Sequence, residues 1–144
     1  MAFLLSLVTQ ERELVTEEVD FVKAKGVDGE FGVLTGHSPF ITLLDPGELV
    51  VRKGDAVFSY YVSGGVAEVL PGSMVILADT VERAEEIDAK LADQARANAV
   101  DALKNPVSES ERKSAAFEFR QASVRLSIAS RRRSGNHPDP LDGD

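Results

Sequence analysis

The chain has 144 residues, of which 43% are hydrophobic and 28% are charged. This length suits one ordinary domain, or one small domain with an appendage, and the hydrophobic content suffices for a packed core. The formal net charge of −8 argues against nucleic acid as the main partner, because neutralising phosphates requires a broad basic surface. Cysteine is absent, which excludes disulfides, a thiol nucleophile and any cysteine-based metal site.

The first apolar run, residues 2–8, is short and is soon followed by acidic residues. It lacks the basic start and the cleavage site of a signal peptide, and it is far shorter than the roughly 20 residues that span a bilayer. We therefore expect a first β-strand here, and a role at membranes only through partner proteins.

Residues 1–80 are predicted to be all-β, because short runs of β-forming residues alternate with turn signals, as in a sandwich or barrel. Tight turns are expected at Lys53-Gly54-Asp55, Ser63-Gly64-Gly65 and Leu70-Pro71-Gly72-Ser73, where glycine permits a positive φ and proline presets a corner. The segment from Glu48 to Ala78 is therefore expected to be a meander of antiparallel hairpins. The expected strands are Phe3–Thr9, Glu13–Ala24, Ile41–Leu44, Glu48–Arg52, Ala56–Val62, Val66–Leu70 and Met74–Ala78.

A helical period replaces the β pattern after Asp79. Asp79 and Glu82 have the spacing of a capping box, and Asn105-Pro106 is expected to end this first helix, because proline clashes with the preceding turn. The stripe expected to face a neighbour consists of Ala84, Ile87, Leu91, Ala95, Asn98 and Ala102.

A second helix is predicted after a second capping box, formed by Ser108 and Glu111. Two helices joined by a short loop usually form an antiparallel pair, so residues 81–133 are expected to be a helical hairpin. Its alanine-rich stripes bury little apolar area, which at roughly 25 cal/mol per Å² predicts marginal stability for the hairpin alone. Residues 134–144 lack periodicity and are expected to be a disordered tail. The stripe on the second helix consists of Ala115, Phe119, Ala122, Leu126 and Ala129.

Charge is distributed unevenly along the chain. Residues 1–80 contain 5 Lys/Arg against 12 Asp/Glu, a net of −7, whereas residues 112–133 contain 7 Lys/Arg against Glu118 alone, a net of +6. A strongly basic helix thus follows an acidic β domain, and a solvated charged face is its simplest explanation.

Few residues are candidates for catalysis. His37 and His137 are the only histidines, and no spacing typical of a metal site, a nucleophile elbow or a phosphate-binding loop occurs. Ser38 beside His37 is a poor nucleophile–base pair, because neighbours in an extended chain point to opposite sides. The acidic residues of segment 85–88 are better explained by a favourable position at a helix start than by cation binding. We therefore expect no enzyme activity, no cofactor and no metal.

Three segments carry more information when they are taken together. Residues 28–40 read DGEFGVLTGHSPF, which alone predicts a long connection between strands. Residues 65–69 (GVAEV), 75–79 (VILAD) and 82–88 (ERAEEID) join a hairpin directly to a helix, and the basic helix ends in three arginines.

In this order and spacing, the segments resemble the epsilon subunit of F-type ATP synthases, over residues 1 to about 133. The resemblance implies a ten-stranded β-sandwich (residues 1–80) that carries an antiparallel helical hairpin (residues 81–133). It also implies a central-stalk subunit that turns with gamma and joins it to the membrane ring of c subunits. The hairpin of such a subunit can rise along gamma toward the alpha/beta catalytic subunits and impede ATP hydrolysis. The implied location is peripheral, on the cytoplasmic face of a bacterial membrane rather than its plastid equivalent.

The resemblance also assigns site residues. Glu30 and His37 stand where the family's loop meets the c ring, and Thr35 replaces a proline that is often found there. The other residues of the contact loop are Phe31, Ser38 and Phe40. The arginines expected to act in inhibition are Arg120, Arg125, Arg131, Arg132 and Arg133.

Some members of this family bind ATP through an Ile/Leu-Asp-x-x-Arg-Ala motif on the first helix, with a glutamate five residues earlier. Leu91 stands in place of the arginine, and Asn98 and Ala102 stand where basic residues are common. Because triphosphate requires fixed cationic donors, we expect weak or absent ATP binding. The positions that do match are Glu82, Ile87, Asp88 and Ala92.

A second interpretation stays open from the sequence alone. The chain would then be a free-standing β-sandwich binding module whose basic helix docks on an acidic protein or on RNA. Co-purification separates the two hypotheses, because a rotor subunit is isolated together with gamma and the catalytic subunits.

Overall fold

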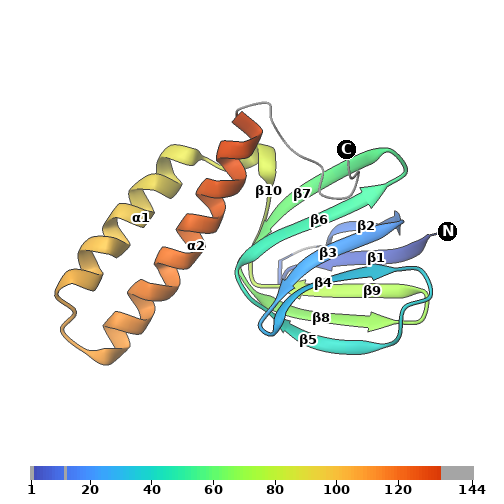
Figure 1. Ribbon diagram of the computed structural model, residues 1–144, viewed down its shortest axis with the longest axis horizontal. Coiled ribbons are helices and arrows are strands. Elements are labelled where there is room, and N and C mark those ends of the chain that lie inside the picture. Colours follow the sequence, from blue (N-terminus) through green and yellow to red (C-terminus); the bar gives the residue numbers. More distant parts are fainter. Residues whose placement is uncertain (1, 12, 134–144) are drawn as a thin grey trace. The chain divides into compact units, whose positions relative to one another are not determined.

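The computed structural model describes residues 2–11 and 13–133, so the predicted tail at 134–144 lies outside the described residues. The chain divides into two compact units that meet between Arg83 and Ala84, and each is described by itself. The first unit is a single curled sheet, shown in two layers in Figure 1. Its strands are β1 (Phe3–Val8), β2 (Glu13–Val19), β3 (Phe21–Gly26), β4 (Gly29–Leu34), β5 (Phe40–Leu44), β6 (Gly47–Lys53), β7 (Ala56–Val62), β8 (Gly65–Leu70), β9 (Ser73–Ala78) and β10 (Val81–Arg83).

The sheet has the strand order β10-β7-β6-β3-β5-β8-β9-β1-β2, and β4 pairs along the whole of β3. All pairs are antiparallel except β1 with β9, which is parallel. The two halves of the sheet are connected through a single bridge, in which Gly26 of β3 pairs with Leu44 of β5. This confirms the predicted β-sandwich of about ten strands followed by two helices.

One apolar core lies between the two halves. Strict alternation along β1 turns Phe3, Leu5 and Leu7 inward, as expected for a strand with one buried face. The rest of the core comes from Val22 and Val33 in one half, and from other strands in both halves. These other core residues include Leu49, Val51, Tyr60, Ala67, Val69, Met74 and Ile76.

The predicted single strand Glu13–Ala24 is wrong, because the chain changes partners at Asp20. The segment before it pairs with β1, and the segment after it pairs with β4 and β6. The backbone N–H of Asp20 donates to the carbonyl of Arg52 at 2.8 Å, and its side chain accepts from the N–H of Gly54 at 2.6 Å. These bonds fix the point at which the chain passes from one half of the sheet to the other.

The predicted meander from Glu48 to Ala78 is correct at its two ends and wrong in the middle. The turns at Gly54 (φ +60°) and Gly72 (φ +79°) close the β6–β7 and β8–β9 hairpins. The Ser63–Gly65 segment instead links strands that do not pair, because β7 pairs with β6 and β10 whereas β8 pairs with β5 and β9.

About half of the predicted long connection at residues 28–40 is a strand. Residues Gly29–Leu34 form β4, and only residues 35–39 form a loop. Gly32 is needed where the strand lies under an aromatic ring, because a Cβ on Gly32 would lie 2.8 Å from Cζ of Phe21. Phe31 and Val33 point to the core from the opposite face.

The second unit contains a 3₁₀ turn (Ala84–Glu86) and two helices, α1 (Ala89–Lys104) and α2 (Glu109–Arg133), which lie side by side in Figure 1. Asn105 ends α1 as predicted. The start predicted at Asp79 is wrong: residues 81–83 form β10, and Asp88 is the N-cap, whose carboxylate accepts from the N–H groups of Lys90 and Leu91.

The predicted contact face of α1 is also wrong, because Leu91 is 63% exposed. The buried face is made only of alanines, Ala89, Ala92 and Ala99. The stripe predicted on α2 is largely confirmed by the buried Ala115, Ala122, Ala129, with Phe119 and Leu126 half-buried. Ile128, buried to 1% exposure, was missed.

Gly65 makes the tightest backbone approach of the sandwich, which predicts a sharp stability effect. Its φ is +144°, and an added Cβ would lie 2.1 Å from the carbonyl oxygen of Leu77 on the neighbouring strand. We expect Gly65→Ala to lower the free energy of unfolding by about 3 kcal/mol or more, because backbone strain and overpacking add. Gly54→Ala is the matched control, since Gly54 also has a positive φ but open space around it, and should cost only about 1–2 kcal/mol. Urea unfolding of both variants measures the difference; equal losses would contradict the close approach.

Candidate functional site

The loop between β4 and β5 is anchored by His37. Its Nδ1 contacts the carbonyl oxygen of Leu34, and its Nε2 lies 3.1 Å from the carbonyl oxygen of Leu70 at the end of β8. The ring also meets Phe3 edge to face, with 5.4 Å between centroids. The imidazole therefore ties the loop to β8 and to the start of β1.

A pair of aromatic rings closes the base of the same loop. Phe31 of β4 and Phe40 of β5 pack at 83°, with 5.3 Å between centroids, a favoured edge-to-face geometry. Phe31 also packs against the core. The loop thus has fixed ends, and its polar residues are presented by a rigid base.

The other predicted loop residues do not converge on one point. Glu30 lies on β4, where its carboxylate is 3.7 Å from the ammonium of Lys23. Ser38 is exposed, whereas Thr35 is half-buried. His37 contacts backbone carbonyls with both ring nitrogens, so it is not paired with the Ser38 hydroxyl as a base.

An apolar surface that the sequence analysis missed covers the outside of four adjacent strands, β5, β8, β9 and β1. Leu43, Val66, Leu77 and Val8 form one cross-strand row on the face opposite the core. The signal was present as consecutive apolar residues, such as Val75-Ile76-Leu77, where one-sided burial would require alternation. We call the exposed large apolar residues that point away from the core on these strands the outer apolar face: Leu4, Ile41, Leu43, Leu70 and Leu77, with exposures of 39–68%.

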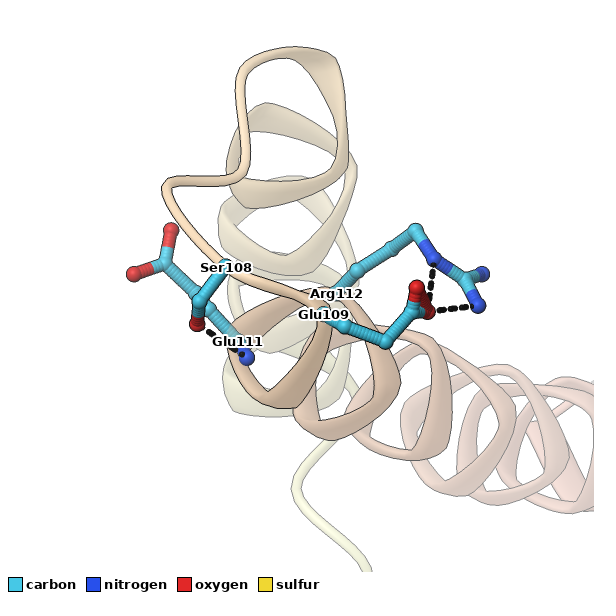
Figure 2. A network of polar contacts seen from close by, with 4 residues as sticks. All are labelled: Ser108, Glu109, Glu111 and Arg112. Carbon is cyan, nitrogen blue, oxygen red and sulfur yellow. Dashed lines mark hydrogen bonds and ion pairs between the residues drawn. The ribbon is translucent and has the colours of Figure 1, made fainter.

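The start of α2 is held by a local polar network (Figure 2). The N–H of Glu111 donates to the Ser108 hydroxyl at 3.1 Å, as Figure 2 shows. The Glu111 carboxylate also accepts from the N–H of Val107 at 3.3 Å. The Glu109 carboxylate binds the guanidinium of Arg112 and raises the pKa of that group, through a hydrogen bond and charge attraction. Ser108 therefore caps the helix as predicted.

The predicted inhibitory arginines all belong to α2. The guanidinium of Arg120 lies 5.3 Å from the ring centre of Phe117, one turn away, in a cation–π contact. Arg125 is half-buried. Residues 131–133 continue the helix to its end at Arg133.

The residues that match the nucleotide motif have structural tasks. Asp88 uses its carboxylate as the cap of α1, and Ala92 is fully buried on the alanine face. Glu82 belongs to β10, where it pairs with Tyr61, and Ile87 is half-buried before the helix. At the arginine position, Leu91 presents an exposed apolar side chain.

Within residues 2–11 and 13–133, no three or more His, Asp or Glu side chains are grouped so that they could hold a metal ion. No helix in the described part of the chain has the length and apolarity needed to cross a membrane.

Comparison with known proteins gives a consistent result for both units. The family model of the β-sandwich domain of the ATP synthase delta/epsilon chain matches residues 2–84. The ATP synthase epsilon chain of Herpetosiphon aurantiacus is 45% identical over 134 residues, which are 93% of this chain and 98% of that relative. The epsilon chain of Chloroflexus aggregans is 43% identical and covers 87% of this chain and 90% of its own length.

Solved structures share the fold. A chain from the Euglena gracilis mitochondrial ATP synthase (OSCP/F1/c-ring, rotational state 1) superposes with a TM-score of 0.72 at 29% identity, over 94% of this chain and 82% of that one. A chain from the central stalk/c-ring of the Tetrahymena thermophila enzyme gives a TM-score of 0.70 over 88% and 95%. At 13% identity, this match shows likeness of fold alone.

The cap at Ser108 predicts the local stability of α2. We expect Ser108→Ala to lower the stability of the first turn by about 1 kcal/mol, because the N–H of Glu111 loses its acceptor. Faster hydrogen exchange at the first amides of α2 is the readout. Ser110→Ala, in the same turn but with an exposed serine, is the control and should leave exchange nearly unchanged. The prediction is wrong if both variants exchange alike.

Proposed function

The chain belongs to the ATP synthase epsilon chain family, and we propose that it is a non-catalytic central-stalk subunit of an F-type ATP synthase. In this role it turns with gamma, helps to join gamma to the ring of c subunits, and restrains ATP hydrolysis through its helical hairpin. Epsilon relatives are matched over nearly their whole length, so the proposal concerns both units.

The outer apolar face is the observation that carries the proposal. Exposed apolar side chains from four adjacent strands meet there, and an apolar patch of this kind typically marks a protein interface. A rigid sheet offers such a partner a preformed surface, so little ordering is required on binding. We assign this face to gamma, the partner that the sandwich of an epsilon subunit must hold during rotation.

The anchored loop is the proposed contact with the c ring. Its base is fixed by the Phe31–Phe40 pair and by His37, so Ser38 and Glu30 are presented with limited freedom. A fixed contact suits a subunit that transmits rotation between two partners. The same bonds argue against a catalytic role for His37, because its two nitrogens already contact carbonyl oxygens.

The hairpin is proposed to act in regulation. Its buried residues on α1 are alanines, so opening it or moving it along gamma exposes little apolar area. The net charge of +6 over residues 112–133 then favours acidic segments of the alpha/beta subunits. We propose that ATP itself is bound weakly or not at all, because Leu91 offers phosphate no donor.

The proposed location is peripheral, on the cytoplasmic face of a bacterial cell membrane and through partners only. Bacterial epsilon chains are the relatives that support it.

A free-standing binding module would instead be isolated without gamma and the catalytic subunits, so co-purification separates the two functions.

Gamma binding should depend on the outer apolar face. We expect Leu77→Glu to weaken binding of the full chain to gamma by at least about tenfold, because a carboxylate would be desolvated in the interface. Phe58→Glu is the matched control, since Phe58 is an exposed apolar residue on β7, outside the outer apolar face, at 38% against 55% for Leu77. Surface plasmon resonance measures both, and circular dichroism checks folding. If the two variants bind gamma with equal affinity, the outer apolar face is not part of the interface with gamma.

Inhibition should depend on the accumulated charge at the end of α2. Exposed ion pairs are worth only about 0.2–1 kcal/mol each, so no single arginine is expected to be decisive. Reversal of Arg131, Arg132 and Arg133 to glutamate should raise ATP hydrolysis by the soluble complex while assembly persists. Inhibition by the unmodified chain should also weaken as salt rises, because the contacts are screened. If the triple variant leaves ATP hydrolysis unchanged and salt has no effect on inhibition, the charges of the basic helix only contact solvent and do not act in inhibition.

A further inference from the structure

One charged side chain lies among the residues of the outer apolar face. In β5, β8, β9 and β1, all of whose residues the structure describes, Glu68 on β8 is the only charged residue. Alternation along β8 buries Ala67 and Val69 on the core side and leaves Glu68 exposed on the other side. Glu68 therefore points outward, in the same direction as the leucines of the outer apolar face.

Apolar side chains surround this carboxylate on the outer side of the sheet. Across the strands, Glu68 pairs with Ile41 of β5 and with Val75 of β9. Along β8, its neighbours on the same side are Val66 and Leu70, two positions away in either direction. A partner that covers these four apolar side chains must therefore cover the carboxylate as well.

The sheet itself offers this carboxylate no cation. Beyond β1 the next strand is β2, whose outward residues opposite Ser6 and Leu4 are Thr16 and Glu18. Glu68 takes part in none of the ion pairs found among the described residues. In the free chain the exposed carboxylate is hydrated, and it loses this water when the face is covered.

Covering an unpaired carboxylate would oppose binding. The loss of hydration of an ionised group costs more free energy than the cover of one neighbouring leucine returns. An opposite charge in the partner offsets this cost, and it adds specificity because a surface without the cation is penalised. Residues 1–80 contain 5 Lys/Arg against 12 Asp/Glu, a net of −7, which also favours a basic partner surface.

We propose that Glu68 forms an ion pair with one cationic side chain of gamma, and that this pair fixes the position of gamma on the outer apolar face. The inference rests on the proposed function, which assigns this face to gamma. Arginine suits the position best, because a guanidinium is weakly hydrated and donates to a carboxylate through two parallel N–H groups. The apolar side chains then supply contact area, and the ion pair supplies specificity.

The first test depends on the direction of a substitution effect, measured by surface plasmon resonance of full-length variants on gamma. Glu68→Leu should weaken binding at least about thirtyfold, because the cation of gamma is left buried without its partner. Glu68→Gln keeps the shape and one acceptor, and should weaken binding about tenfold. Without the ion pair the direction reverses, because leucine removes a desolvation cost and extends the apolar face. Unchanged or tighter binding of Glu68→Leu would overturn the inference.

Glu18→Leu and Glu18→Gln are the matched controls. Glu18 is an exposed glutamate on the same side of the sheet, opposite Leu4, but it lies on the terminal strand β2. A charge at the rim of an interface is worth little, so each control should change affinity less than about threefold. Circular dichroism and thermal unfolding check that every variant is folded. If the Glu18 and Glu68 variants lose affinity equally, Glu68 has no special partner and the inference is wrong.

The second test identifies the partner charge by reversal. Glu68→Arg should weaken binding at least about a hundredfold, because two cations then face each other. Each Lys and Arg of gamma is next changed singly to Glu, and every gamma variant is measured against Glu68→Arg. One of them should restore affinity at least about tenfold, while it weakens binding of the unmodified chain. If no gamma variant restores binding, the ion pair does not exist.

The outcomes separate the inference from the proposed function. If the unmodified chain does not bind gamma, the proposed function fails and the inference fails with it. If Leu77→Glu weakens binding whereas Glu68→Leu does not, the outer apolar face is the interface and only the ion pair is overturned. Self-association of Glu68→Leu without loss of gamma binding also overturns it, since Glu68 would then only keep copies of the chain apart.

Discussion

The surfaces of the first unit depend on the way in which one continuous sheet curls around a single apolar core. The two halves are joined by one bridge, Gly26 with Leu44, and by the crossings at Asp20 and Ser63–Gly65. Because the core is filled from both halves, each of the strands β1 to β9 contributes at least one buried side chain to it. Outside the core, exposed large apolar side chains lie on β5, β8, β9 and β1, whereas Lys23 and Glu30 form an ion pair on β3 and β4 of the other half.

The helical hairpin follows a different physical rule. Alanine on the buried face lets two helices approach closely while contributing little transfer free energy, so caps and charge pairs matter relatively more. The Ser108 cap and the Glu109–Arg112 pair lie where α2 begins and define the hairpin's turn. A rigid sandwich and a lightly held hairpin in one chain suit the separate tasks of holding partners and responding to them.

Local chemistry made part of this predictable from the sequence. The turn at Gly54, the cap at Ser108 and the end of α1 at Asn105 each depend on residues within a few positions. The predictions that failed concern segments whose hydrogen-bond partners are distant in the sequence. Asp79 has the same capping pattern as Ser108, but its N–H donates to the carbonyl of Gly64, and the following residues join the sheet as β10.

The functional surfaces were harder to predict for the same reason. The loop proposed as a contact was singled out through resemblance, whereas its anchoring by Leu70 and Phe3 requires strands that are far apart in sequence. The outer apolar face combines side chains from four strands, and only the register of the sheet brings them into one row.

The parallel pairing of β1 with β9 has a consequence for the order of folding. Leu5 pairs with Met74, so the first strand of the chain finds this neighbour only after nearly the whole sandwich sequence is available. Closing such a long loop is slow compared with forming a local hairpin, and the β1–β2 hairpin forms without it. During synthesis, the edge of β1 that pairs with β9 therefore stays unpaired until β9 has been made. The helical hairpin consists of local contacts, so it forms last and quickly. The sandwich sets the folding time of the chain.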